Sequence, residues 1–128
     1  MGGEETPFPV QEGEMKLTKL VEELALKVQT AQKGLEREVQ GGYASDLLSD
    51  VMANSQEGDV WVTIQAHPNI VAVATLRDLA GIILANDRQP DTETLQRAEE
   101  EAVPLLCTSL PTFEVVGRLY RLGILGHG

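Results

Sequence analysis

The sequence has few cysteines and few aromatic residues. Its 128 residues include a single cysteine, Cys107, and the aromatic fraction is only 4%. One cysteine cannot form a disulfide within the chain, so stability must come from a packed core. Hydrophobic residues make up 42% of the chain, and a domain of roughly this length buries about two-thirds of its unfolded surface without a disulfide or a metal. We therefore expect one globular domain.

Positive charge is also scarce. The chain has 10 Lys and Arg against 20 Asp and Glu, which gives a net charge of −10. Such a charge repels the phosphates of nucleic acids and of anionic lipids. No apolar run approaches the roughly 20 residues of a membrane helix, and the N-terminus lacks the basic and apolar segments of a signal peptide. We expect a cytoplasmic protein that binds neither nucleic acid nor membranes.

Signatures of catalysis are missing as well. The sequence contains no GxxxxGK[S/T] phosphate loop, no GxGxxG, no GxSxG and no paired CxxC, which excludes the enzyme classes that need them. Cys107 lies in an apolar stretch and is expected to be buried filler. Asp46 and Asp50, one helical turn apart, lack a third ligand of suitable spacing. We expect no metal, no cofactor and no catalytic residue.

Composition divides the chain into three parts. Residues 1–14 hold four acidic residues, three Gly and two Pro without any periodicity, so we expect a disordered leader. A regular pattern begins at Met15, and we expect the folded domain to span residues 15–124. Residues 125–128 form a Gly-flanked tail, and we expect His127 within it to have no functional role.

Strand-like and helix-like patterns alternate through residues 15–124. Strands are predicted at residues 26–30, 38–44, 58–65, 81–85 and 103–108, from alternating or continuous apolar residues. Helices are predicted after Thr18, Ser45 or Asp46, Pro68, Asp91 and Pro111, which suit helix N-termini. This order predicts an α/β fold: a single three-layer domain with a mostly parallel sheet of about 4–5 strands and helices on both faces.

The periodicity also predicts how the helices pack. Two helices should bury the sets Leu47, Leu48, Val51 and Met52, and Ile70, Val71, Val73, Ala74 and Leu76. The last helix presents Phe113, Val116 and Tyr120 on one stripe and should stop at Gly123. The pair Gly41-Gly42 indicates close backbone approach or a bulge. Apolar residues in excess of one core, such as Trp61, Val71, Val73 and Met52, suggest a homodimer.

Ligands of open α/β sheets gather outside the carboxyl ends of the strands. Three loops there, at residues 41–46, 63–69 and 108–112, carry hydroxyl or amide side chains next to a helix start. Hydroxyls and free backbone N–H groups of this kind can bind an anionic or polar ligand. The candidate ligand-binding residues are Ser45, Asp46, Thr63, His67, Asn69, Thr108 and Thr112.

These side chains allow other interpretations. Ser45, Asp46, Ser109 and Thr112 are also typical helix caps. In a small enzyme, His67 would be the base, with Ser45, Asp46 or Thr108 positioning the substrate, although a single His at a strand end is more often an ordinary loop residue. As a third possibility, the chain is a structural accessory subunit of a metabolic or redox complex, whose acidic surface selects basic partners.

Several short elements, taken in order, resemble the DRTGG domain. They are Gly34-x-x-Arg37-x-Val39, the helix start at residues 45–49, the strand beginning Gly58-Asp59-Val60-Trp61, the strand at residues 80–84, and the strand at residues 104–108 that runs into Thr112-Phe113-Glu114. The resemblance covers residues 17–122. The Thr-Gly-Gly element of the family name is not present as such.

The resemblance implies a regulatory role. DRTGG domains occur beside CBS domains in regulated pyrophosphatases, in front of some phosphotransacetylases, and as short free-standing proteins likened to the non-catalytic N-terminal domain of HPr kinase. It therefore implies a non-enzymatic regulatory, ligand-sensing or assembly module that acts as a homodimer. Its partners would be a small anionic or nucleotide ligand and an enzyme. Kinase activity is not expected, because the sequence has no phosphate-binding loop with its lysine and metal-holding hydroxyl.

Overall fold

The computed structural model describes residues 15–30 and 32–127; the predicted leader at residues 1–14 lies outside them. Within these residues, one sheet has the strand order β1-β5-β4-β3-β2. Strands β2 to β5 are parallel, and β1 is antiparallel to β5. The strands are β1 (Lys27–Thr30), β2 (Gly41–Ala44), β3 (Asp59–Thr63), β4 (Gly81–Leu84) and β5 (Leu105–Cys107).

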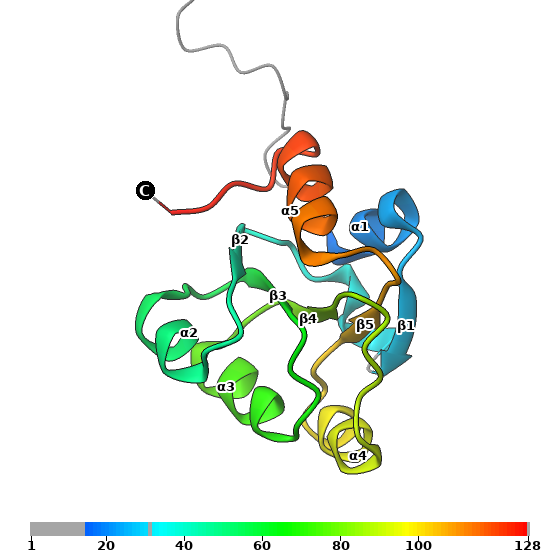
Figure 1. The fold of residues 1–128 in the computed structure, drawn as a ribbon, viewed down its shortest axis with the longest axis vertical. Helices are drawn as coiled ribbons and strands as arrows, with labels where there is room; N and C mark the ends of the chain where they lie inside the picture. Colours follow the sequence, from blue (N-terminus) through cyan, green and yellow to red (C-terminus); the bar gives the residue numbers. More distant parts are fainter. Residues whose placement is uncertain (1–14, 31, 128) are drawn as a thin grey trace, which may run out of the picture.

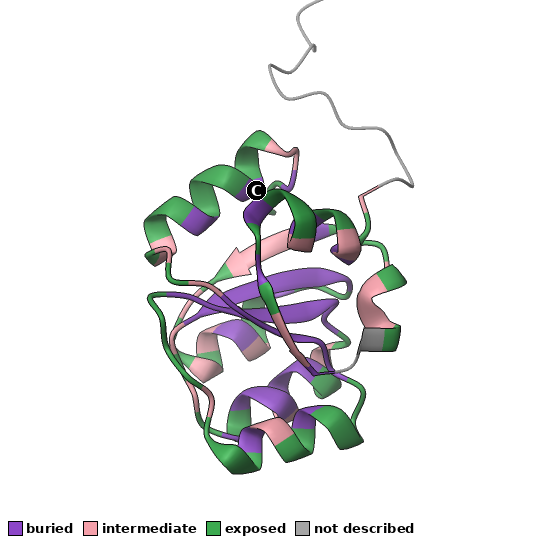
Figure 2. Ribbon diagram, turned by 90° about the vertical axis from the view of Figure 1, so that its right-hand side faces the viewer, coloured by how far each residue is buried: buried purple, intermediate pink, exposed green. Residues whose placement is uncertain are grey.

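Helices cover both faces of this sheet (Figures 1 and 2). One face is covered by α1 and α5, and the other by α2, α3 and α4. The helical elements are α1 (Leu17–Leu24), the short 3-10 helix η2 (Gln32–Glu36), α2 (Leu48–Asn54), α3 (Asn69–Arg77), α4 (Thr92–Glu100) and α5 (Thr112–Arg121). The predicted three-layer α/β fold with a mostly parallel sheet is confirmed. None of the helices in the described residues has the length and apolar character needed to cross a bilayer.

The two halves of the core lie on opposite faces of the central strands. In β3, Val60 and Val62 pack toward α1 and α5, whereas Trp61 packs toward the other helices. This division follows from the alternation of side chains along a strand. Because both faces are covered, all five residues of β3 are buried, as is typical of parallel strands; Figure 2 shows the buried strands between the helical layers.

Helix periodicity was only a partial guide to burial. α3 buries Ile70, Val71, Val73 and Ala74 as predicted, but Leu76 is 71% exposed. At 3.6 residues per turn, Leu76 lies about 120° around the helix from Ile70, about 140° from Val71 and about 160° from Ala74, so it points away from most of the buried side. Leu47 is 65% exposed because it adopts an extended conformation just before α2.

The apolar residues that suggested a dimer surface belong mostly to the core. Trp61 and Val71 are fully buried, and Val73 is 6% exposed. They pack in one cluster with Ile82 and Leu84 of the sheet, and Met52 packs against it. These positions therefore offer no interface, and the surface argument for a dimer has to come from other residues.

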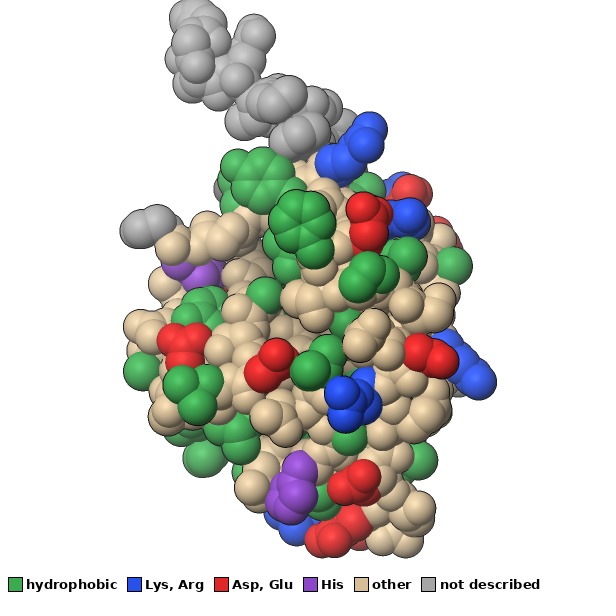
Figure 3. Space-filling view, in the orientation of Figure 1, with side chains coloured by type: hydrophobic (Ala, Val, Ile, Leu, Met, Phe, Trp, Pro, Cys, Tyr) green, Lys and Arg blue, Asp and Glu red, His purple; other side chains and the backbone are tan. Residues whose placement is uncertain are grey.

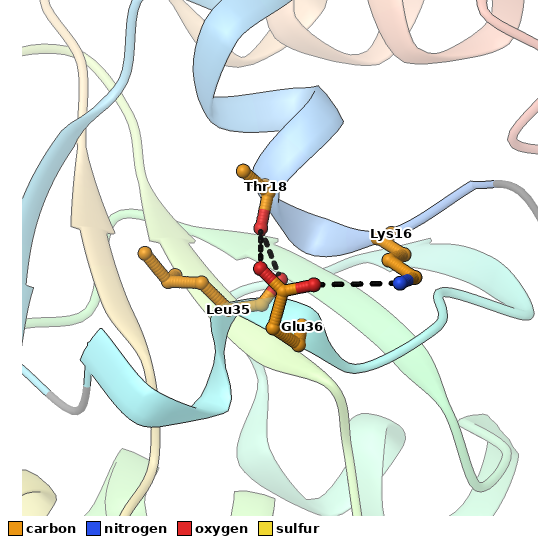
Figure 4. Close-up of polar contacts among 4 residues, drawn as sticks. All are labelled: Lys16, Thr18, Leu35 and Glu36. Atoms are coloured by element: carbon orange, nitrogen blue, oxygen red, sulfur yellow. Dashed lines mark hydrogen bonds and ion pairs between the residues drawn. The ribbon is translucent and has the colours of Figure 1, made fainter.

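The start of α1 differs from the prediction. Thr18 lies inside the helix, and Lys16 is the N-cap residue without a side-chain hydrogen bond. The Thr18 hydroxyl instead donates to the Leu35 carbonyl oxygen at 2.7 Å and lies 3.3 Å from Glu36 Oε2, as Figure 4 shows. Lys16 and Glu36 add an ion pair of 3.4 Å, but both are exposed and such pairs contribute little. The hydroxyl of Thr18 ties α1 to η2.

The C-terminal segment runs along the free edge of β2. The backbone N–H of Gly42 donates to the Leu125 carbonyl oxygen at 3.1 Å. A Cβ atom on Gly41 would lie 2.9 Å from that oxygen and 3.0 Å from Asp59 Oδ1. The predicted close backbone approach at Gly41-Gly42 is therefore confirmed. Gly123, with φ of 95°, lets the chain reverse after α5.

His127, expected to have no functional role, contacts a buried side chain of the sheet. Its Nε2 lies 2.7 Å from Asp59 Oδ1. The Asp59 side chain is fully buried, and the His127 side chain is 27% exposed. A buried carboxylate is costly unless it is paired or hydrogen-bonded. His127 thus has a structural role that composition did not indicate, because Asp59 is 68 residues away in the sequence.

Candidate functional site

The carboxyl ends of β2 and β3 are joined by side chains from the predicted set. Asp46 Oδ1 accepts hydrogen bonds from Thr63 Oγ1 at 2.8 Å and from the Ile64 backbone N–H at 2.9 Å. Gln65 Nε2 donates to the Asp46 carbonyl oxygen at 2.9 Å. The structure thus brings together two of the predicted residues, Asp46 and Thr63, and their hydrogen bond joins the two loops.

Ser45 and Asp46 do not cap α2. The N-cap residue is Leu47, without a side-chain hydrogen bond. Ser45 Oγ accepts from the Leu47 N–H at 3.2 Å in a local turn, and the Ser45 carbonyl oxygen accepts from Trp61 Nε1 at 2.8 Å. The capping interpretation is therefore wrong for these two residues, because the Ser45 hydroxyl bonds within a local turn and the Asp46 carboxylate bonds to Thr63 and Ile64.

Asp50 has partners different from those of Asp46. Hydrogen bonds from Ser45, Tyr43 and Asn54 lower the pKa of the Asp50 carboxyl; those from Tyr43 and Asn54 measure 2.8 Å each. The two aspartates therefore do not form a shared site. Across residues 15–30 and 32–127, no group of three or more His, Cys, Asp or Glu side chains is placed to hold a metal ion.

His67 and Asn69 form a turn at the start of α3. The Asn69 backbone N–H donates to His67 Nδ1 at 3.1 Å, and this turn is exposed. Among the described residues, His67 forms no hydrogen bond with Ser45, Asp46 or Thr108. A base aligned by these partners, as the enzyme interpretation requires, is not assembled in this structure.

The carboxyl ends of β4 and β5 form the second part of this edge. After β4, Asn86 and Asp87 both adopt left-handed backbone conformations, with φ of 61° and 57°. Their N–H groups donate to the carbonyl oxygens of Leu110 and Thr108, at 2.7 and 2.9 Å. Left-handed backbone at a residue other than glycine costs roughly 1 kcal/mol or more. The two hydrogen bonds hold this conformation and bring the loop after β4 against the loop after β5.

A hollow of about 350 Å³ opens beside these two loops. Its polar lining comes from Lys27, Asp87, Gln89, Thr108, Ser109 and Arg118. Thr108 was predicted as a site residue, and its Oγ1 accepts from the Leu110 N–H at 3.1 Å. Thr112, also predicted, is the first residue of α5, whose N-terminus has no side-chain cap. We call this space the β5 hollow.

Two cationic side chains of the β5 hollow were missed by the sequence reasoning. Lys27 reaches it because antiparallel pairing places Lys27 opposite Cys107. Arg118 comes from α5, where its Nε lies 3.3 Å from Glu114 Oε1. No local pattern marks either residue, since the hollow is formed by segments about 90 residues apart in the chain. The only sequence signal is the spacing of Glu114 and Arg118, which is that of a helical ion pair.

Cys107 lies in the wall of the β5 hollow but is only 5% exposed. Burial raises the pKa of its thiol, and the positive charge of Lys27 opposes this shift only in part. The prediction of buried filler is confirmed by the exposure. Because the thiolate is the reactive form, we expect native protein at pH 8 to react with iodoacetamide on the order of tenfold more slowly than urea-unfolded protein, as measured by mass spectrometry.

The matched control for this measurement is Ser109→Cys in a Cys107→Ser background. Ser109 is exposed and lies two residues after Cys107, in the loop that follows β5. This thiol should react at nearly the same rate in native and unfolded protein. Equal rates for Cys107 in the two states would show that the end of β5 opens freely in the native protein.

The residues that carry the family resemblance have structural partners. A Cβ atom on Gly34 would lie 2.9 Å from Pro104 Cγ, so this turn packs tightly against the start of β5. Arg37 donates to Asp78 Oδ1 at 2.9 Å and to the Asp78 carbonyl oxygen at 2.8 Å, and this bonding lowers the pKa of the Asp78 carboxyl. Val39 is 7% exposed. This motif therefore fixes the connection from η2 to the sheet.

The fold is found in a known regulatory protein. The structure is similar to a crystal structure of the CBS and DRTGG domains of the regulatory region of a pyrophosphatase from Clostridium perfringens, complexed with its activator diadenosine tetraphosphate. The TM-score is 0.68 at 14% sequence identity, over 87% of this chain and 50% of that chain. This chain thus spans half the length of that regulatory region, and the likeness is one of fold.

Sequence comparisons agree with the structural one. No curated protein matches the chain. The family model of the DRTGG domain matches residues 19–122. This range includes all five strands of the sheet and all the helices of the described residues, apart from the first two residues of α1. The chain belongs to the DRTGG domain family.

Proposed function

We propose that this domain is a non-catalytic regulatory module that works in the cytoplasm as a homodimer. In this proposal it binds a small anionic ligand in the β5 hollow and signals its occupancy to a partner enzyme. The observation that carries the proposal is that two cationic side chains, Lys27 and Arg118, both line the β5 hollow. Membership of the DRTGG family supports the regulatory role. The one cysteine, buried and unpaired, is compatible with a reducing compartment.

The chemistry of the β5 hollow suits an anion. Lys27 supplies a point charge and Arg118 a planar guanidinium, which together can bind a phosphate or carboxylate. Hydroxyls of Thr108 and Ser109 can donate further hydrogen bonds. A volume of about 350 Å³ lies at the lower end of the range of small-molecule sites, about 300–1,000 Å³.

The other predicted residues receive different roles in this proposal. Ser45, Asp46 and Thr63 hold the neighbouring loop, since their polar atoms already bond to the backbone or to each other. His67 and Asn69, exposed at the start of α3, remain candidates for contact with a part of the ligand that extends beyond the hollow. Asp87, which also lines the hollow, would accept a hydrogen bond from a ligand hydroxyl or amine.

Binding can be transmitted through α5. Arg118 is held by Glu114 at 3.3 Å, and both side chains are about half exposed. An anion in the hollow would compete with Glu114 for the guanidinium, so occupancy would change the charge pattern on the outer side of α5. The same helix is anchored on the sheet by Val115 and Leu119, which are buried. A partner enzyme could therefore detect the changed charge pattern on the outer side of α5 while the core stays folded.

Thermal unfolding with AMP, ATP, diadenosine tetraphosphate, acetyl phosphate and inorganic phosphate tests the ligand class. A ligand at about 100 times its dissociation constant stabilises the native state by about 2.7 kcal/mol, which should raise the melting temperature by several degrees. Lys27→Ala and Arg118→Ala should each reduce this shift. The control is Arg97→Ala, an exposed cation on α4, which should leave it unchanged.

Two results would contradict the proposal. One is the absence of a shift with any of these anions at millimolar concentration. The other is a full shift in the Lys27→Ala/Arg118→Ala double variant, which would place the ligand elsewhere. The homodimer is tested separately by light scattering at about 100 μM, a concentration at which even a micromolar dimer is mostly associated, and which should give twice the 13.9 kDa mass of one chain.

A further inference from the structure

Helix α5 has two apolar sides. Its inner side is formed by Val115 and Leu119, which are buried against the sheet. Its outer side carries Phe113, which is 88% exposed, together with Val116 at 38% and Tyr120 at 50%. At 3.6 residues per turn, Phe113 and Tyr120 lie about 160° and about 140° around the helix from Val115, and about 120° and about 100° from Leu119, which places both on the outer side. Figure 3 shows hydrophobic side chains gathered on the surface over α5.

A second hollow lies beside the C-terminal half of this helix. It has a volume of about 280 Å³ and is bounded by α5, by β2 and by the C-terminal segment. Val116 and Tyr120 line it from the helix, and Leu125, which is 43% exposed, lines it from the C-terminal segment. α5 therefore has a protruding aromatic ring near its first residue and an apolar hollow near its last turn.

We infer that this outer side of α5 docks a second copy of the chain, with the two α5 helices antiparallel across a two-fold axis near Gly117. Phe113 and Tyr120 are placed symmetrically about the middle of the helix, so antiparallel packing puts Phe113 of each copy beside Tyr120 and the apolar hollow of the other. This arrangement is an isologous interface, in which one patch is complementary to itself. The inference rests on the proposed homodimer and names its interface.

Gly117 supports a helix as the occupant. It lies in the middle of α5, and a Cβ atom there would meet nothing within 4 Å. Packing within the chain therefore does not require glycine, and glycine inside a helix is unfavourable relative to alanine. Close approach of another backbone is a reason for glycine at such a position. If two α5 helices cross at Gly117, the missing side chain lets their backbones approach closely. Phe113 of one copy can then reach the apolar hollow beside α5 of the other copy.

The charges on α5 select the antiparallel orientation. Glu114 lies in the first turn, whereas Arg118 and Arg121 lie in the last turn. In an antiparallel pair, Glu114 of each copy lies toward the arginines of the other. In a parallel pair, like charges would face each other, which is unfavourable. Arg118 also lines the β5 hollow, so one side chain connects the ligand site with the interface.

Phe113→Asp in the full-length protein tests the surface. The ring is exposed, so the variant should keep its circular dichroism spectrum; its melting temperature should fall only by the concentration-dependent stabilisation that dimerisation supplies. We expect its dimer dissociation constant, from sedimentation velocity over about 1–200 μM, to rise on the order of 100-fold, which corresponds to losing a buried hot-spot aromatic. Leu76→Asp is the matched control, because Leu76 is 71% exposed on α3, and it should leave the constant unchanged.

A crosslinking measurement tests the orientation. Gly117→Cys should form an intermolecular disulfide under mild oxidation, because the two-fold axis brings position 117 of both copies together. Leu76→Cys should not. The buried Cys107 does not compete for this reaction.

The outcomes distinguish a failure of the α5 interface from a failure of the proposed homodimer. A monomeric wild-type protein at 100 μM, in the concentration range where weak dimers form, would overturn both the proposed homodimer and this interface. A wild-type dimer that survives Phe113→Asp unchanged would overturn only the interface. A dimer that survives Phe113→Asp but is lost when residues 2–14 are deleted would assign the contact to that segment instead. Ligand binding in the β5 hollow is measured separately, by thermal unfolding with the anions. A failure of ligand binding can therefore be distinguished from a failure of the dimer or of its interface.

Discussion

Replacing Trp61 with alanine should lower the free energy of unfolding by about 3–5 kcal/mol. Trp61 is fully buried in β3 and packs against the side of the core formed by α2, α3 and α4. The substitution removes a large apolar side chain and leaves a cavity that the rigid central strand can fill only in part. It also removes the donor to the Ser45 carbonyl oxygen, a hydrogen bond of 2.8 Å.

Urea unfolding followed by far-ultraviolet circular dichroism measures this effect. Fluorescence is unsuitable, because Trp61 is the only tryptophan of the chain. Trp61→Phe is the control: it keeps much of the apolar volume and loses the N–H donor, so it should cost clearly less. A loss below about 1.5 kcal/mol for Trp61→Ala, smaller than burial of a side chain of this size implies, would contradict the packing described for β3.

The central sheet was predictable because its signal is local. Residues 58–65 combine a Gly-Asp turn with alternating and β-branched apolar residues, and residues 81–85 form a continuous apolar run. Both are typical of strands covered on two faces, and the structure has β3 and β4 there. The direction of β1 was not specified by any pattern. It depends on pairing with β5, nearly 80 residues away, which periodicity does not report.

Side-chain exposure was less predictable than the elements themselves. Periodicity states which residues share one side of a helix, but it does not state which side meets the sheet. α5 is the clearest case, because it has an apolar stripe on each side and the structure buries Val115 and Leu119. The stripe of Phe113, Val116 and Tyr120 that stood out in the sequence faces outward. This second apolar side of a surface helix is the feature on which the proposed α5 interface rests.

The candidate site was predictable at the level of loops. The rule for the carboxyl ends of parallel strands selected the loops that contain Asp46, Thr63 and Thr108. It did not distinguish side chains that bind a ligand from side chains that hold the loops, and Asp46 and Thr63 bond to each other. Lys27 was missed because its strand runs antiparallel to the others. Charged side chains that reach a site from distant segments of the chain cannot be predicted from the local pattern of a single sequence.

Replacing Asp59 with alanine should lower the free energy of unfolding by about 2–4 kcal/mol, the cost of losing hydrogen bonds to a buried charged group. Its side chain is fully buried at the start of β3. Oδ2 accepts from the Gln56 N–H at 2.8 Å, which closes the turn before the strand, and Oδ1 contacts His127 Nε2 at 2.7 Å. Asp59→Asn retains an acceptor for one of these contacts and should cost less.

A double-mutant cycle with His127→Ala separates the two contacts of Asp59. If the carboxylate holds the C-terminal segment through His127, the double variant should be more stable than the sum of the single losses predicts, by on the order of 1 kcal/mol. The remaining loss then belongs to the turn at Gln56. A coupling energy near zero would mean that His127 leaves Asp59 in solution. The segment beside β2 would then be held by the Gly42–Leu125 hydrogen bond and by the buried side chain of Ile124, and the apolar hollow next to α5 would be open on the side of His127.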